Sequence, residues 1–451
     1  MKSQRLNFLP ARTWIAASIA ATLACSASSG FAQTVTESEL ARKLDQLAAE
    51  LATVKAQLAQ IQQQQKQPQP QSQPQRVEAA PVVAPITAQA VAPVVASSGP
   101  ATVLTSYGEI NYNRPTHATQ DTQIDLRRFV LGYQHRFDEK TKVVAELEVE
   151  HAVASSGDVG EVAIEQAYIE RQFTSTWAAR AGLFLMPVGL INENHEPTAF
   201  YGVERNFVET AIIPSTWREG GVQIVGTFDN GLTVQGGVAS SFNLKKWDVT
   251  SSDGKESPLG SIHQELAKAK GHGLAVFGAV NWRGVPGLLL GGSLFSGQAS
   301  QAQTVAHSRI TLWDLHARWT PGRWDFSTLY TRASISNTAA LNVAALKETP
   351  TDNPTLIPKS FDGYYVQGAY KLWSHEDYAL TPFVRWEHFN TARAYADLGP
   401  GLTPEAGRGE SVVTLGANFQ VAQGVVVKTD YQLFREDRTR DRFNLGLGWS
   451  F

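Results

Sequence analysis

Apolar and polar residues alternate along most of the chain from residue 103 to residue 451. The last eight residues, NLGLGWSF, have an apolar side chain at every second position: Leu445, Leu447, Trp449 and Phe451. Successive side chains of a β-strand point to opposite faces of its sheet, so a period of two predicts strands with one apolar and one polar face. The same alternation recurs at 128–137, 143–150, 313–319 and 413–420.

The connections between these segments alternate in length. Seven are short turns: DEKT (138–141), TSTW (174–177), DNG (229–231), RGVPG (283–287), TPGR (320–323), SHED (374–377) and AQG (422–424). Eight are longer polar loops: 113–123, 152–160, 187–220, 243–272, 298–308, 336–361, 391–410 and 436–441. These connections would join sixteen strands. An even strand number, with short turns at one rim and long loops at the other, is typical of an outer-membrane barrel.

Aromatic residues flank several of the short turns: Phe173, Trp177, Trp282, Trp319, Trp324, Trp373 and Tyr378. A soluble β-sandwich also shows alternation, but indole and phenol rings at successive strand ends are expected where lipid meets water. Because hydrocarbon cannot satisfy free backbone groups, the sheet should close, with residues 444–451 pairing with the strand near 104–112. The predicted fold class is therefore all-β, a 16-stranded antiparallel transmembrane β-barrel.

Residues 1–32 have the pattern of a secretory signal peptide. Basic residues precede an apolar stretch at 14–24, and Gly30-Phe31-Ala32 supplies a small-residue cleavage site. The alternative is a lipoprotein that is cut before Cys25. Export with cleavage after Ala32 would leave no cysteine, hence no disulfide. Cleavage would also change the formal charge from −3 to −6, which disfavours nucleic acid as a partner.

Two further segments precede the barrel. Residues 33–66 predict a short periplasmic coiled coil, with a seam at steps of four and three: Leu40, Leu44, Leu47, Leu51, Val54, Leu58 and Ile61. Leucine at a with β-branched residues at d favours trimers or tetramers over dimers. A helix that packs on its own domain is the alternative. Residues 67–102 are rich in Pro, Gln and Ala, which predicts an extended linker.

Several segments resemble the phosphate-selective porin O and P family of Gram-negative bacteria. They are DLRRFVLGYQHRF (125–137), AYIERQF (167–173), RAGLFLMPVGL (180–190) and WREGGVQIVG (217–226). The terminal Phe451 likewise resembles the insertion signal of outer-membrane barrels. The resemblance implies a homotrimer of 16-stranded barrels in the cell outer membrane, which passes small hydrophilic solutes or ions, with phosphate as one candidate. It covers most of residues 103–451.

The charges of the expected lumen differ from those of that family. Its type members select phosphate through dense rows of arginine and lysine, whereas residues 103–451 contain 31 Lys and Arg against 37 Asp and Glu. The predicted lumen face of the strand at 143–150 carries Glu146, Glu148 and Glu150. Since selectivity follows the sign of the lining charges, we expect a weakly cation-selective or nonselective channel.

The connection at 187–220 is far longer than a hairpin needs, and such loops are usually functional. We expect it to fold inward as the pore constriction, as the third loop does in general porins. Its charged residues are Glu193, His195, Glu196, Glu204, Arg205, Glu209, Arg218 and Glu219. The facing walls are expected to supply Arg128, Arg136, Arg180, Arg318, Arg332, Arg385 and Lys428. Acid on one side and base on the other would create a transverse field.

Each of these residues also has a simpler structural explanation. Lumen charges can be cross-strand ion pairs that fill a polar interior, and a lone loop histidine such as His195 is usually solvated. We find no Gly-x-Ser-x-Gly, His-Glu-x-x-His, P-loop or cysteine metal motif. The sequence therefore predicts no enzyme and no catalytic, cofactor or metal site. The alternatives to a porin are an outer-membrane barrel that hydrolyses lipid and a barrel that serves mainly as a tether to the cell wall.

Overall fold

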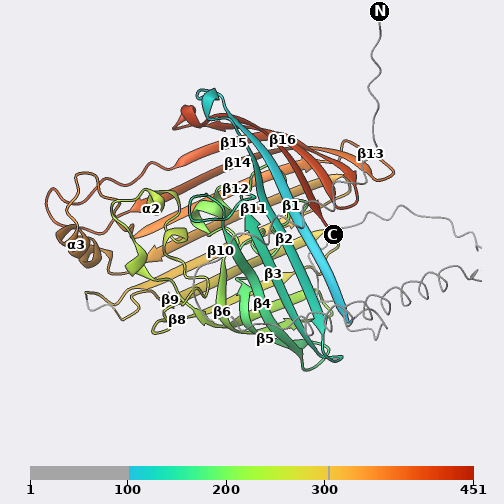
Figure 1. Ribbon diagram of the computed structural model, residues 1–451, viewed down its shortest axis with the longest axis horizontal. Coiled ribbons are helices and arrows are strands. Elements are labelled where there is room, and N and C mark those ends of the chain that lie inside the picture. The colour runs from blue at the N-terminus through green and yellow to red at the C-terminus, as the bar shows by residue number, and fades with distance from the viewer. Residues whose placement is uncertain (1–100, 303–304) are drawn as a thin grey trace, which may run out of the picture. The chain divides into compact units, whose positions relative to one another are not determined.

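The computed structural model describes residues 101–302 and 305–451. The predicted signal peptide, coiled coil and nearly all of the linker lie outside the described residues. One antiparallel sheet dominates the described part of the chain (Figure 1). Its first strand, β1 (Thr102–Pro115), pairs with both β2 (Gln123–Arg136) and the last strand, β17 (Arg442–Ser450). The sheet is therefore closed.

The strands are consecutive neighbours around the barrel. The others are β3 (Thr141–Glu150), β4 (Val162–Gln172), β5 (Trp177–Leu185), β6 (Arg218–Thr227), β7 (Leu232–Ser240), β8 (Leu274–Trp282), β9 (Leu288–Gln298), β10 (Arg309–Trp319), β11 (Trp324–Ile335), β12 (Ser360–Tyr370), β13 (Trp373–His375), β14 (Tyr378–Ala394), β15 (Glu410–Ala422) and β16 (Val425–Phe434). Because β12 and β13 both pair with β14, they occupy one position. The barrel thus has sixteen strand positions, as predicted.

Helical segments are short and lie in the loops. The α-helices are α2 (Asp253–Glu256) and α3 (Thr338–Glu348), and the single turns are η1 (Thr119–Asp121), η2 (Val208–Ile212), η3 (Leu244–Lys246), η4 (Gly260–Ile262) and η5 (Arg438–Arg440). Within the described ranges, no helix is both long and apolar enough to cross a bilayer.

All fifteen predicted connections are present, with seven short turns at one rim and eight longer loops at the other, and their bounds differ from the predicted ones by at most four residues. The third long loop is shorter than expected, because β6 already begins at Arg218, which pairs with Leu185. The expected boundary at residue 220 is therefore wrong by three residues. We call residues 186–217 the inward loop.

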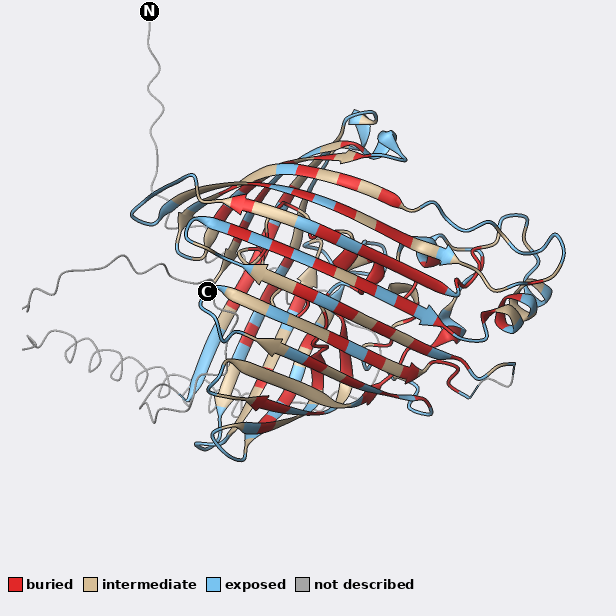
Figure 2. Cartoon of the chain, turned by 180° about the vertical axis from the view of Figure 1, so that it is seen from behind, coloured by how far each residue is buried: buried red, intermediate tan, exposed pale blue. Residues whose placement is uncertain are grey.

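The alternation along each strand separates two faces, which appear as bands of buried and exposed residues (Figure 2). In β17, Leu445 and Leu447 are about 40% exposed on the outer face, whereas Asn444 is fully buried on the inner face. In β10, Leu315 is exposed on the outer face, whereas Leu312 is buried inside. The polarity of the two faces is as predicted for β17 but not throughout the barrel.

Part of the interior is apolar, which the sequence analysis did not anticipate. Trp217, Phe242 and Phe295 pack together inside, with ring centroids 4.8–5.4 Å apart. They belong to a larger buried cluster that includes Phe184 and Phe361. Loop segments that enter the barrel displace water from the wall, so the wall residues behind them are apolar. The interior is thus a packed core on that side rather than a uniformly wet lumen.

Candidate functional site in the barrel interior

The inward loop crosses the barrel and contacts strands that are distant in sequence. Its backbone amides donate to carboxylates of three separate strands: Gly189 to Asp314 of β10 (3.2 Å), Val203 to Asp430 of β16 (2.6 Å) and Phe207 to Glu387 of β14 (2.6 Å). The side chain of Lys428 on β16 also donates to the backbone oxygen of Phe200 (3.0 Å). Buried wall carboxylates therefore hold the loop inside through its main chain.

Two polar side chains of the loop fix its own shape. The amide of Asn192 joins both ends of the loop: Nδ2 donates to the carbonyls of Met186 and Trp217 (both 2.8 Å), and Oδ1 accepts from the Trp217 amide (2.7 Å). The Oε1 atom of Glu209 accepts from the amides at 190 and 191. Burial raises the pKa of Glu209, although these hydrogen bonds oppose the shift. The loop is thus internally braced.

The small residues of the last strand make room for the loop. A side-chain Cβ at Gly446 would lie 3.1 Å from Val203 Cγ1, and one at Gly448 would lie 2.6 Å from Pro197 Cβ. Both distances are shorter than ordinary carbon contacts. The alternation in NLGLGWSF therefore serves two surfaces, an apolar outer face and an inner face against which the inward loop packs.

The predicted wall arginines form ion pairs with nearby carboxylates. Arg128 contacts Glu109 (3.0 Å) and Glu148 (3.2 Å), and Arg180 contacts Glu170 (2.8 Å). In the same way, Arg318 contacts Asp325 (2.6 Å), and Arg385 contacts Glu387 (2.9 Å). These pairs join residues of one strand or of neighbouring strands. The expected separation of acid and base onto opposite sides is therefore wrong for these four arginines.

Three of the predicted wall or loop residues lie elsewhere. Arg218 shares the outer face of β6 with Val222 and pairs with Glu265 of the β7–β8 loop (2.8 Å). Arg332 is exposed on the outer face of β11, and Arg136 is exposed at the short-turn end of β2. The expectation that Arg218 and Arg332 line the lumen is wrong, because their positions in the alternation point them outward.

Of the remaining predicted residues, Glu219 is buried on β6, and the others belong to the inward loop. Glu204 accepts from Asn111 and Asn113 of β1, and Arg205 donates to the carbonyl of His195 (3.0 Å). Glu193 is exposed and accepts from Gln235 of β7 (3.0 Å), whereas Glu196 is half-buried. The loop thus brings Glu193, Glu196, Glu204, Arg205 and Glu209 into the interior together.

His195 is buried rather than solvated, which corrects the sequence-based expectation. Its Nδ1 lies 3.0 Å from the Asn192 carbonyl, and its Nε2 lies 2.6 Å from the hydroxyl of Tyr107. That hydroxyl donates its proton to Glu165 Oε2 (2.5 Å). Both imidazole nitrogens must then be donors, so the geometry fits a protonated His195. The neighbouring Glu165 carboxylate stabilises this charge.

Glu146, Glu165 and His195 are also the described residues that could together hold a metal ion. One potential ligand atom from each lies within 4.8 Å of the others. The hydroxyl of Tyr107 lies between two of them, and its hydrogen bonds account for their approach. Sequence analysis missed this cluster because its members come from β3, β4 and the inward loop, with no ligand spacing between them.

Comparisons with known proteins agree with the architecture. No protein-family model matches the chain. An uncharacterized protein of Aquifex aeolicus is 28% identical over 352 residues, which cover 76% of this chain and 79% of that protein. OmpF of Salmonella typhi, solved in complex with daunomycin, aligns with a TM-score of 0.54 and 12% identity over 78% of this chain and 97% of its own.

Other solved barrels align less closely. The outer-membrane channel DcaP of Acinetobacter baumannii has a TM-score of 0.47 and 12% identity, over 78% of this chain and 97% of its own. The anion-selective porin from Comamonas acidovorans has a TM-score of 0.45 and 12% identity, over 78% of this chain and 100% of its own. From the OmpF alignment, the chain has the fold of an outer-membrane porin barrel.

Raising the pH should loosen the inward loop. Burial lowers the pKa of His195, but the carboxylate of Glu165 more than offsets this effect and raises the pKa overall. The protonated form therefore stabilises loop docking below the ordinary pKa of histidine, and this contribution is lost as pH rises through the raised value. Limited proteolysis between about pH 6 and pH 9 should show faster cleavage of the loop at the alkaline end.

Two substitutions control this test. His195→Gln should abolish the pH dependence of cleavage, whereas His388→Gln, at a histidine of β14 that hydrogen-bonds Ser411 and no residue of the inward loop, should preserve it. If the cleavage rates of the wild type and of His195→Gln depended on pH in the same way, this result would contradict the assignment of a protonated His195.

Removing one partner of a buried interior pair should destabilise the barrel strongly. Glu387→Ala leaves the guanidinium of Arg385 buried without its carboxylate, which should cost about 3–5 kcal/mol of unfolding free energy. The double substitution Arg385→Met with Glu387→Leu should cost less. Urea unfolding of the purified barrels measures the free energy of unfolding of both variants. As a control, Arg171→Ala breaks the exposed pair with Asp138 and should have little effect; an equal effect from Glu387→Ala would refute the prediction.

Proposed function

We propose that this protein is an outer-membrane porin, a channel for the passive diffusion of small hydrophilic solutes or ions. The observation that carries the proposal is the inward loop, which enters a closed barrel and is held there by carboxylates of β10, β14 and β16. A loop held across the interior narrows any passage through it, and the rigidity of its anchors gives that passage a defined size.

The outer surface supports a membrane location. Side chains on this face are large and apolar in mid-strand, for example Leu315 (62% exposed) and Val366 (50% exposed). Trp319 and Trp324 lie exposed at the short-turn ends, where an aromatic girdle is expected. A soluble protein rarely exposes apolar residues over such an extent. We therefore propose that lipid surrounds the barrel in the cell outer membrane, after export by the signal peptide.

The passage that we propose runs between the inward loop and the wall that includes β5 and β7. On this side Glu193 is exposed, and Arg180 and Gln235 are half-buried. The opposite side holds the buried anchors of the loop, such as Lys428 and Asp430. Hydrated solutes would follow the accessible polar side, because entering the packed side would require breaking buried ion pairs and hydrogen bonds.

The charges of the interior favour a weakly cation-selective or nonselective channel over a phosphate channel. Arg128, Arg180, Arg318 and Arg385 are each paired with a carboxylate. Paired guanidinium groups offer little net field to an anion, and acids outnumber bases in residues 103–451. From the resembling segments alone, we propose that the chain belongs to the phosphate-selective porin O and P family. This proposal does not include phosphate as the transported solute.

We also propose that the protein assembles as a homotrimer. The support is the leucine seam from Leu40 to Ile61 and the resemblance to a trimeric porin family. A periplasmic coil joined to each barrel by the linker at 67–102 would hold three chains together without constraining their pores.

Shortening the inward loop should enlarge the channel. Deleting residues 197–206 removes the middle of the loop, and single-channel conductance in a planar bilayer should rise several-fold because the constriction is lost. The matched control removes the ten residues 338–347, most of α3 in the β11–β12 loop, and should leave conductance close to that of the wild type. An unchanged conductance after deletion of 197–206 would exclude the loop as the constriction.

The reversal potential in a salt gradient should indicate weak cation preference or none. Glu148→Gln, which frees Arg128 from one of its carboxylate partners, should shift the potential toward anions by a few millivolts. The reversal potentials of the wild type and of Glu148→Gln are measured in the same salt gradient. Strong anion selectivity of the wild type would instead support a phosphate-type channel.

A further inference from the structure

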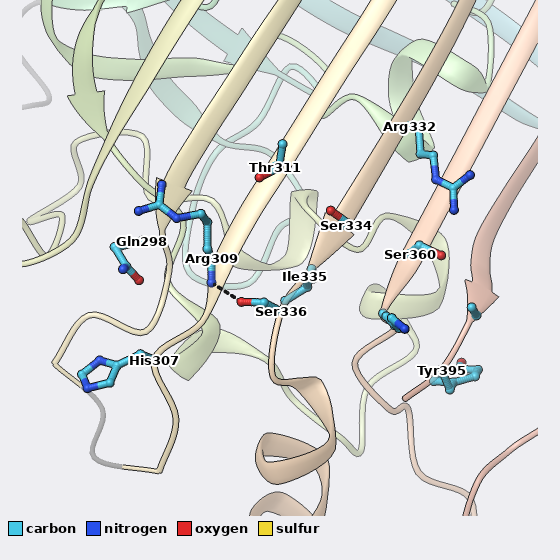
Figure 3. A pocket seen from close by; sticks show the side chains of 12 residues that line it. Gln298, His307, Arg309, Thr311, Arg332, Ser334, Ile335, Ser336, Ser360 and Tyr395 are labelled. Atoms are coloured by element: carbon cyan, nitrogen blue, oxygen red, sulfur yellow. Dashed lines mark hydrogen bonds between the residues drawn. The ribbon is translucent and has the colours of Figure 1, made fainter. Parts of the chain in front are cut away.

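A pocket of about 670 Å³ opens on the outer wall at the long-loop ends of β9 to β14 (Figure 3). It is lined by Gln298, His307, Arg309, Thr311, Arg332, Ser334, Ile335, Ser336, Lys359, Ser360, Ala394 and Tyr395. Thr311, Ser334 and Ser360 lie on the outer face, where the register places Thr311 opposite Ser334 and Ser334 opposite Ser360. The pocket therefore lies outside the lumen.

The lining of this pocket is basic and lacks acids. Arg309, Arg332 and Lys359 are all exposed, and none of the three forms an ion pair with another residue of the described chain. The backbone amide of Arg309 donates to the hydroxyl of Ser336 (2.9 Å), and its guanidinium donates only to the hydroxyl of Ser296 (3.1 Å) within the described chain (Figure 3). The neighbouring carboxylate of Asp362, opposite Arg332 in the register, is paired with Arg393 (3.3 Å). The positive charge of the pocket is thus uncompensated, unlike that of the interior arginines.

The aromatic residues below the pocket fix its depth relative to a membrane. Trp313, Tyr330 and Tyr364 form a row on the outer face, with successive centroids 5.3 and 6.4 Å apart. Toward the long loops, the next outward residues of β11 are Arg332 and Ser334. Outer-wall side chains therefore change from apolar to polar and cationic within one or two residues, as expected where hydrocarbon gives way to headgroups.

The chemistry of the lining suits a phosphate. Guanidinium groups bind phosphate oxygens through charge-assisted hydrogen bonds, and the hydroxyls of Thr311, Ser334 and Ser360 are further donors. We propose that this pocket binds the phosphate of a lipid headgroup in the outer leaflet. A lipid is favoured over free phosphate because the pocket opens beside the aromatic row, which would contact the rest of the lipid. The inference rests on the membrane location in the proposed function.

Binding of a phosphorylated lipid to the purified full-length barrel in neutral detergent tests this proposal. The probes are bisphosphorylated lipid A, the same lipid after removal of its phosphates, and inorganic phosphate. The wild type should bind only the first with saturation in the micromolar range or tighter. Arg309→Gln with Arg332→Gln should weaken that binding by roughly tenfold or more, because each basic group near a headgroup contributes to attraction.

A matched variant controls for charge alone. Lys347→Gln with Arg408→Gln removes two exposed charges from long loops at the same rim but outside the pocket, and it should bind like the wild type. Resistance to unfolding by detergent at room temperature confirms that each variant is folded. Equal binding by both variants would overturn the proposal, as would equal binding of the dephosphorylated lipid. Tight inorganic phosphate binding would overturn it in favour of a free-anion site.

The result of the lipid-binding experiment is independent of the result of the channel assay. Arg309 and Arg332 lie outside the lumen, so their substitution should leave single-channel conductance unchanged. A barrel that binds the lipid but does not conduct would refute the porin proposal alone, whereas a conducting barrel with no lipid binding would refute the pocket alone.

Discussion

The closure of the sheet by β1 and β17 is the constraint on which the rest of the structure depends. Each of the two edge strands of an open sheet leaves a row of backbone donors and acceptors unpaired, and hydrocarbon offers them no partner. Here Tyr107 to Pro115 pair with Ser450 back to Arg442, so no edge remains in the described barrel. Closure also creates an enclosed interior, and the chain must then fill it.

The inward loop determines how that interior is filled. Where the loop lies against the wall, water is excluded, and each buried polar group needs a partner within the protein. Wall carboxylates such as Glu387 and Asp430 therefore accept from loop amides, and wall arginines pair with adjacent acids. Apolar rings such as Trp217 and Phe295 fill the space that remains. Pairing and packing thus both follow from the exclusion of water by one segment.

Arginines of this barrel act differently according to the face of the strand from which they project. Arg318 projects inward from β10 and pairs with Asp325, whereas Arg332 on the adjacent strand projects outward and forms no ion pair with a carboxylate of the described chain. The interior arginine is neutralised because an unpaired charge is costly where water is scarce. The outer arginine lies where water and headgroups meet, so its charge can remain free for a ligand.

The sequence by itself determined the strands and their number, because a period of two and the turn residues are local properties that the barrel preserves. It also identified the third long loop, from its length. Only the tertiary structure decided the contacts of that loop: His195 meets Tyr107 and Glu165 across 88 and 30 positions of the chain, and no local pattern encodes such pairs. The pairing of the arginines and the orientation of Arg218 and Arg332 were likewise settled by register and by loop packing, since alternation assigns a face only when the position of each strand is fixed against its neighbours.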